Sequence, residues 1–266
     1  MDMNDPQMYV DSLRILYDDR KIGVSKSSPP FACRYLDSCK AAAEPRKLRN
    51  GSEAYIGDKY GDPIRLVVVS LDTGGSAEDE KRRDNPMRWE GIEELTFDGA
   101  NPHMKGTIQT LQYLYGYKPE SDLLPRFAMT NSAKCSGKDN DKSMVRGELY
   151  ENCRDHGLAE LGVLNPQLVV TQGAKARDLL ECRCIGQKEI REHVPSLMWG
   201  DVDVGSWICT QVKEHLRYWK NGDQPVLVLQ CPHPSARQGQ WQRFERTMLP
   251  TLAHVIRQWL PDLANL

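Results

Sequence analysis

Four short apolar segments, each followed by a helical segment, constrain the fold of this chain most strongly. They lie at residues 65–71, 126–130, 167–171 and 226–231. Near-continuous apolar runs of this length are typical of strands that are buried on both faces. Strand–helix alternation repeated four times predicts an α/β fold, a three-layer αβα sandwich with a central four-stranded parallel sheet.

The segments between and after the strands have apolar residues at helical spacing. We expect helices over residues 107–115, around 149–161, over 174–181 and over 241–259. Proline cannot donate a backbone hydrogen bond and clashes with the preceding turn, so Pro250 is expected to kink or split the last helix.

The chain is expected to form a single domain with one terminal extension and two insertions. Its 266 residues suffice for one large α/β domain, and no internal repeat is found. The polar segment 1–30 is expected to form an N-terminal extension, with a short helix over 9–17. Residues 77–106 and 182–222 predict insertions, the second with a helix near 210–220.

Composition and charge are those of an ordinary globular protein. The chain is 39% hydrophobic and 27% charged, and its net charge of −2 gives no overall attraction to nucleic acid. It has no run of 18 apolar residues and no apolar signal segment at its start, so we expect a cytoplasmic monomer that does not contact a membrane. Its eight cysteines then favour buried thiols, a metal or a cluster over disulfides.

Each predicted strand is followed by a residue that can take part in binding or chemistry. Asp72, Asn131, Gln172 and His233 follow the first, second, third and fourth strands. Ligands of open α/β sheets bind beyond the carboxyl ends of the parallel strands. These four side chains are therefore expected to converge on one cleft, where a carboxylate and an imidazole suit hydrolysis by water or proton transfer.

Other interpretations of these residues stay open. A Ser–His–Asp triad could use Ser235 or Ser70, although the Gly-x-Ser-x-Gly motif is missing. The phosphate-loop motif is missing too, which disfavours nucleotide hydrolysis. Singly, Asp72 could cap a helix, Asn131 could stabilise a turn and His233 could pack between prolines. Four such residues at one sheet edge make a shared site the better interpretation.

Three further segments occur in an order and spacing that match one enzyme superfamily. The segment Thr130-Asn-Ser-Ala-Lys-Cys135 is followed, after 17 intervening residues, by Cys153. The fourth strand leads into His233-Pro-Ser235, and the first into residues 69–74, Val-Ser-Leu-Asp-Thr-Gly. Together they resemble the iron–sulfur branch (families 4 and 5) of the uracil-DNA glycosylase superfamily, over about residues 31–260.

The resemblance implies a bound [4Fe–4S] cluster. Its implied ligands are Cys33, Cys39, Cys135 and Cys153. Iron–sulfur clusters are held by cysteine thiolates, and four of them suffice. The cluster's implied role is structural, tying the N-terminal segment to the loop after the second strand. Zinc is the open alternative, because four thiolates also suit a zinc ion.

The resemblance also implies a monofunctional DNA glycosylase. Such an enzyme flips the target base out of double- or single-stranded DNA and hydrolyses its glycosidic bond, leaving an abasic site. Asp72 is implied to stabilise the sugar cation and position the water, and His233 to donate a hydrogen bond to the departing base. Asn131 is implied to read the edge of the base, and His103 or Met104 to stack on it.

DNA contacts and substrate follow from the same resemblance. Ser235 is implied to bind a flanking phosphate, Arg237 to enter the gap in the base stack, and Lys134 to hold the backbone. The branch usually has Gly-Glu-Ala-Pro-Gly in its first motif, whereas residues 70–74 here are Ser-Leu-Asp-Thr-Gly. Two substrates stay open, namely uracil in repair and a modified pyrimidine, such as hypermodified phage cytosine in antiphage defence. A non-catalytic iron–sulfur DNA-binding protein is the alternative of another class.

Overall fold

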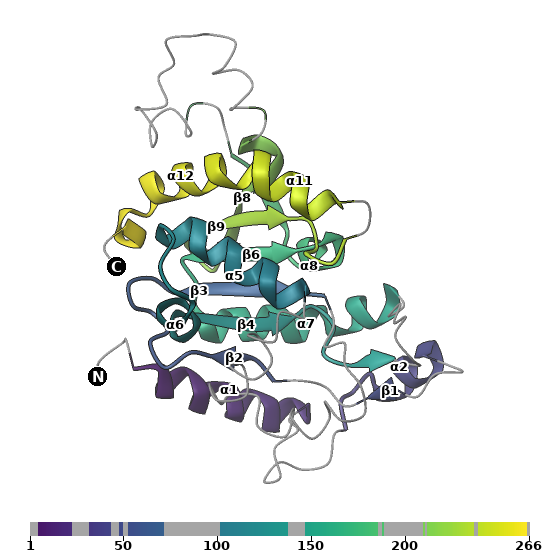
Figure 1. The fold of residues 1–266 in the computed structure, drawn as a ribbon. Coiled ribbons are helices and arrows are strands. Elements are labelled where there is room, and N and C mark those ends of the chain that lie inside the picture. The colour runs from purple at the N-terminus through teal and green to yellow at the C-terminus, as the bar shows by residue number, and fades with distance from the viewer. Residues whose placement is uncertain are drawn as a thin grey trace, which may run out of the picture.

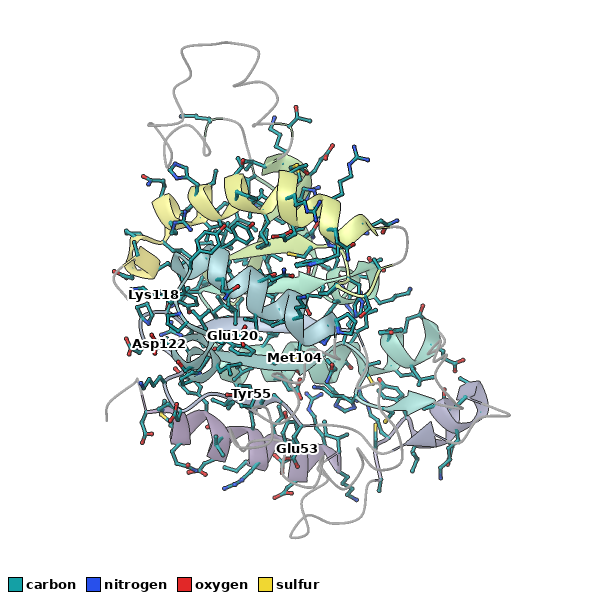
Figure 2. All side chains as sticks on the ribbon, viewed as in Figure 1. Glu53, Tyr55, Met104, Lys118, Glu120 and Asp122 are labelled. Atoms are coloured by element: carbon teal, nitrogen blue, oxygen red, sulfur yellow. The ribbon has the colours of Figure 1, made fainter. Side chains whose placement is uncertain are left out.

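A computed structural model describes most of the chain. The described residues are 5–22, 32–43, 48–49, 53–71, 102–137, 147–185, 188, 210, 212–236 and 239–264. Their centre is a seven-stranded mixed sheet with helices on both faces (Figure 1). Side chains fill the space between the sheet and these helices (Figure 2).

Four parallel strands form the middle of the sheet. They are β3 (Leu66–Ser70), β4 (Phe127–Asn131), β6 (Leu168–Gln172) and β9 (Gln224–Cys231), in the spatial order β4-β3-β6-β9. All residues of β3 and β6 are buried, as expected for strands covered on both faces. The four strands predicted from the apolar segments are thus confirmed.

Three antiparallel strands extend this parallel core to seven strands, so the expected four-stranded parallel sheet is only the core of a larger mixed sheet. On one side β2 (Tyr55–Ile56) pairs with β4, and on the other β8 (Leu216–Asn221) pairs with β9 and β7 (Cys182–Cys184) with β8. Residues 210 and 212–215 are helical, so the helix expected near 210–220 is confirmed there but is wrong for the residues of β8. These residues instead form a hairpin with β9, through a turn in which Gly222 has a φ of +59°.

Two separate hydrophobic clusters lie on the two faces of the sheet. Leu66 and Val68 of β3 point into one cluster, together with α5 (Pro102–Tyr115), α11 (Gln240–Thr247) and α12 (Leu249–Trp259). Val67 and Val69 point into the other, with α1 (Pro6–Arg20), α7 (Gly147–Leu164) and α8 (Ala174–Asp178). This alternation follows the two-residue period of a strand.

Proline sets two helix boundaries. Pro250 lies in the first turn of α12. The helix is interrupted at Met248, between α11 and α12, so the expected split of the last helix is confirmed. Pro102 begins α5, earlier than the sequence predicted. His103 and Met104 therefore lie on the first turn of a helix, while the rest of the expected insertion 77–106 lies outside the described residues.

Short elements complete the description. A two-stranded sheet pairs β1 (Leu48–Arg49) with β5 (Ser136–Gly137), and α2 (Leu36–Ala43) precedes it. The remaining elements are α6 (Glu120–Leu123), η1 (Leu124–Arg126) and η4 (Pro261–Ala264). Among the described helices, none combines the length and the apolar character that crossing a membrane requires.

Candidate functional site at the carboxyl edge of the sheet

The carboxyl ends of the parallel strands meet at one edge of the sheet. Ser70 at the end of β3 is in register with Asn131 on β4, and Gln172 at the end of β6 is in register with Cys231 on β9. The chain leaves β3 toward α5 on one face and leaves β6 toward α8 on the other. Such a switch between adjacent strands opens a crevice, which is where α/β sheets bind ligands.

A buried polar cluster occupies this switch point. His103 Nε2 lies 2.7 Å from Gln172 Oε1 and 2.9 Å from Ser70 Oγ. Gln172 Nε2 donates to Thr107 Oγ1 over 2.9 Å, and Thr107 Oγ1 donates to the His103 carbonyl over 3.1 Å. Gln172 Oε1 is thus the acceptor end of its amide, so His103 carries a proton on Nε2.

This proton position bears on the alternative of a Ser–His–Asp triad. A nucleophilic Ser70 would need a histidine nitrogen that accepts its proton, whereas the nearby Nε2 of His103 donates. Burial, and next the neighbouring His233, lower the pKa of His103 to about 4. His103 is therefore a neutral hydrogen-bond donor at pH 7, which disfavours Ser70 as a nucleophile.

His233 stacks on His103. The two ring centroids are 5.1 Å apart and the ring planes are inclined by 11°. The backbone N–H of Ser235 donates to His233 Nδ1 over 3.2 Å, so the proton of the neutral ring lies on Nε2. Burial lowers the pKa of His233, which favours that neutral form. The edge thus holds a neutral imidazole whose orientation is fixed by stacking and by its own turn.

Two glycines allow the His233 turn to approach its neighbours. A Cβ on Gly106 would lie 2.4 Å from the Pro234 Cβ, so α5 can reach the turn only where it has no side chain. Gly173 has a φ of +95°, and its Cβ would lie 3.3 Å from the His233 Cβ. The positions of His103 and His233 therefore depend on small residues that the sequence analysis did not single out.

Lys134 does not lie where the expected DNA contact requires. Its side chain is buried, forms an ion pair with Glu160 of α7 and donates to Thr130 Oγ1. Tyr17 of α1 donates to the other oxygen of Glu160 over 2.7 Å. A lysine held in this way cannot reach a phosphate at the surface, so the expected contact of Lys134 with the DNA backbone is wrong. Lys134 instead fixes the loop that follows Asn131.

The other predicted site residues fall into three groups. Asn131 is half-buried at the sheet edge. Met104, which Figure 2 labels, follows His103 in the first turn of α5 and is buried. Ser235 is exposed beside the His233 turn. Asp72 and Arg237 lie outside the described residues. Sequence reasoning named Ser70 only as a possible nucleophile and missed Thr107, which is an ordinary hydroxyl residue of a helix.

Four cysteines line one small cavity next to this edge. The cavity is lined by Cys33, Cys39, Cys135 and Cys153, together with Lys134, His156 and mostly apolar residues. Burial raises the pKa of Cys135 well above its usual value, and the neighbouring thiols of Cys153, Cys39 and Cys33 raise it further. Burial likewise raises the pKa of Cys153 to about 11. Thiols this close together and this buried need a cation to be stable as thiolates.

The spacing of the thiols bears on which cation they suit. Within the described residues, no three His, Cys, Asp or Glu side chains are grouped closely enough to hold one metal ion. A zinc ion needs its four sulfurs at about 2.3 Å from one centre. An iron–sulfur cluster accepts sulfurs that are further apart, because each cysteine binds a different iron of a [4Fe–4S] cluster. Four thiols around one cavity are the donor set that an iron–sulfur cluster requires, and four thiolates also suit zinc.

A comparison with known protein families gives no match for this chain, and a search of curated protein sequences gives none either.

Proposed function

We propose that this chain is a DNA glycosylase, which flips a pyrimidine out of DNA and hydrolyses its N-glycosidic bond. The observation that carries the proposal is the His233 turn, with a neutral, stacked imidazole at the carboxyl edge of the sheet. Asn131, at the same edge, supplies an amide with one donor and one acceptor. The resemblance of the motifs around Asn131 and His233 to the iron–sulfur branch of uracil-DNA glycosylases supports the same assignment.

His233 has the clearest role in this proposal. Negative charge develops on the base as the glycosidic bond breaks, and a fixed donor stabilises that charge more than it stabilises the bound substrate. The proton on Nε2 makes His233 such a donor. His103 fixes the ring by stacking, and is itself held by Gln172 and Ser70. The buried polar cluster around His103 therefore fixes the position of the His233 donor before the substrate binds.

The remaining roles rest on the resemblance and on where residues stand in the chain. Asp72 follows the end of β3 and is proposed to stabilise the sugar cation and to position the attacking water. Ser235, exposed beside His233, is proposed to bind the phosphate next to the flipped nucleotide. Asn131 is proposed to distinguish bases by pairing with the edge of the pyrimidine.

A [4Fe–4S] cluster is proposed at the four-cysteine cavity. Cys33, Cys39, Cys135 and Cys153 would hold it, each as a thiolate. A bound cluster supplies fixed iron–thiolate bonds and no step of the hydrolysis. It would join α2 and α7 to the loop from Asn131 to Cys135, which carries the proposed base-reading residue. Its contribution is therefore to the geometry of that loop.

Loss of iron is the expected result of replacing a buried ligand. Protein purified without oxygen should be brown, and Cys135→Ser or Cys153→Ser should abolish the visible absorbance and the bound iron. Cys184→Ser is the matched control, since Cys184 is exposed on the edge strand β7, and it should keep both. A colourless wild-type protein with one zinc ion per chain would contradict the cluster.

An assay for base release tests whether the protein is a DNA glycosylase. Oligonucleotides carrying uracil, hydroxymethylcytosine or glucosylated cytosine are incubated with the protein as duplexes and as single strands, and abasic sites are then cleaved with alkali. Cleavage of at least one substrate, lost in Asp72→Ala and His233→Ala, is expected. Strand cleavage that both variants retain would refute the glycosylase, and binding without any cleavage would favour the non-catalytic alternative. The substrate that is cut distinguishes repair of uracil from removal of a modified pyrimidine.

A further inference from the structure

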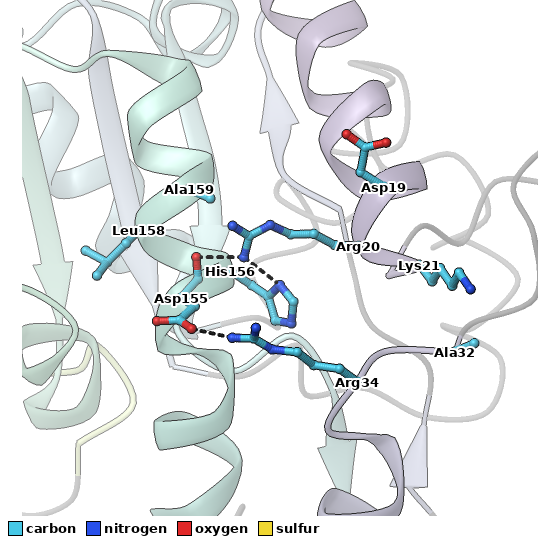
Figure 3. Close-up of a pocket in the computed structure, with 9 residues that line it drawn as sticks. All are labelled: Asp19, Arg20, Lys21, Ala32, Arg34, Asp155, His156, Leu158 and Ala159. Carbon is cyan, nitrogen blue, oxygen red and sulfur yellow. Dashed lines mark hydrogen bonds and ion pairs between the residues drawn. The ribbon is translucent and has the colours of Figure 1, made fainter.

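A second cavity lies against the four-cysteine cavity. It is a groove of about 770 Å³ between the end of α1, the segment around Arg34 and the middle of α7 (Figure 3). Arg20, Arg34, Asp155 and His156 are among its lining residues. His156 lines both the groove and the four-cysteine cavity, so its ring stands between them.

The hydrogen bonds of His156 determine which ring nitrogen carries the proton. Arg20 Nη1 lies 3.1 Å from His156 Nδ1, and His156 Nε2 lies 3.3 Å from Cys33 Sγ. A guanidinium group can only donate, so Nδ1 accepts and the proton lies on Nε2. The N–H of Nε2 therefore donates to the Cys33 sulfur.

Surrounding contacts hold His156 in this orientation. Arg20 Nη1 also donates to the backbone carbonyl of Asp155 over 3.0 Å, which fixes the guanidinium against α7 (Figure 3). The Tyr35 ring meets the imidazole edge-on, with the centroids 6.2 Å apart. His156 is only 2% exposed, although it lines a groove open to solvent. Cys33 is the least buried of the four cysteines, and its sulfur contacts the His156 ring, which also lines the groove.

We propose that His156 is a positioning residue for the iron–sulfur cluster, which donates a hydrogen bond to the Cys33 ligand and closes the cluster cavity toward the groove. The inference rests on the proposed cluster. Hydrogen bonds to ligand sulfurs stabilise the more negative, reduced cluster and so raise its reduction potential. A ring that fills the opening also keeps water and chelators from the iron bound to Cys33.

His156→Leu separates these effects from a general loss of structure. Leucine keeps most of the volume but removes the donor, so we expect a lower reduction potential in a dye-mediated titration followed by electron paramagnetic resonance. Iron should pass to a chelator about 10-fold faster or more, because removing a residue that supports a metal ligand typically weakens metal binding about 10–100-fold. His156→Gln, whose amide nitrogen can take the place of Nε2, should restore most of both properties. His254→Leu, on the exposed side of α12, is the matched control and should match the wild type.

The outcomes distinguish this inference from the proposed function. A wild-type protein without a cluster ends both the cluster and the inference, whichever bases the protein releases. A cluster whose potential and rate of iron loss are the same in His156→Leu as in the wild type overturns the inference alone. If His156→Leu does not fold, His156→Asn replaces it, because its amide reaches the position of Nδ1 and not that of Nε2. Equal properties of the Asn and Gln variants would then overturn the inference.

Discussion

Replacing Lys134 by methionine is expected to lower the free energy of unfolding by about 3–5 kcal/mol, the usual cost of removing one partner of a buried ion pair. Glu160 would remain fully buried in α7 without the ammonium group that neutralises it. The Tyr17 hydroxyl still donates to Glu160, but a hydrogen bond from a neutral group does not replace a positive charge. Urea denaturation followed by circular dichroism measures the loss, with the protein kept reduced and the cluster state matched.

Two further variants make this stability measurement specific. Arg154→Met breaks the ion pair with Glu181, whose carboxylate is largely exposed, so it should cost no more than about 1 kcal/mol. Lys134→Met combined with Glu160→Leu removes both charges and should recover part of the stability lost in the single variant. A single variant as stable as the wild type would contradict a stabilising Lys134–Glu160 ion pair.

Removing the imidazole of His233 is expected to slow base release by about 10²–10³-fold, the usual effect of deleting one donor to a developing negative charge. The effect should fall on the rate of the chemical step, because the donor acts mainly after the bond begins to break. Single-turnover measurements with protein in excess over the substrate found by the base panel isolate this step. Binding of the uncleaved oligonucleotide should change little.

Replacing His233 by glutamine tests whether the role of His233 is to donate a hydrogen bond to the base. His233→Gln retains a donor near the position of Nε2 and should lose less activity than His233→Ala, whereas His254→Ala should lose none. Burial lowers the pKa of His233, so the wild-type rate should hold as the pH falls to the ordinary histidine pKa and decline only below it. A His233→Ala variant within about threefold of the wild type would exclude His233 as the donor, since one donor is worth far more.

The central strands could be predicted because local sequence determines them. Each is an apolar run bounded by turn residues, and burial on both faces needs no information about its partner. The edge strand β8 could not be predicted in this way. Its buried residues, Leu216 and Trp219, do not alternate with exposed ones, and its hydrogen bonds depend on pairing with β9. A helix near 210–220 was therefore the wrong expectation for residues whose structure is set by a neighbouring strand.

The candidate site was predictable where topology alone decides it. The carboxyl ends of parallel strands share one edge, and Asn131, Gln172 and His233 lie there. The stack of His103 on His233 was beyond prediction, because it requires α5 to begin at Pro102 and to approach the turn at Gly106. Lys134 was misjudged for a related reason. A lysine in a polar loop suggests an exposed side chain, and its partner Glu160 comes from a helix further along the chain.

The segment from Thr130 to Cys135 takes part in three separate features of the structure. It includes Asn131 at the sheet edge, Lys134 of the buried ion pair and Cys135 of the four-cysteine cavity. Under the proposed function, a substitution here would alter folding stability, cluster retention and base selection together. Mutational paths toward a new substrate are therefore expected to leave this segment alone and to act on other residues at the carboxyl edge of the sheet.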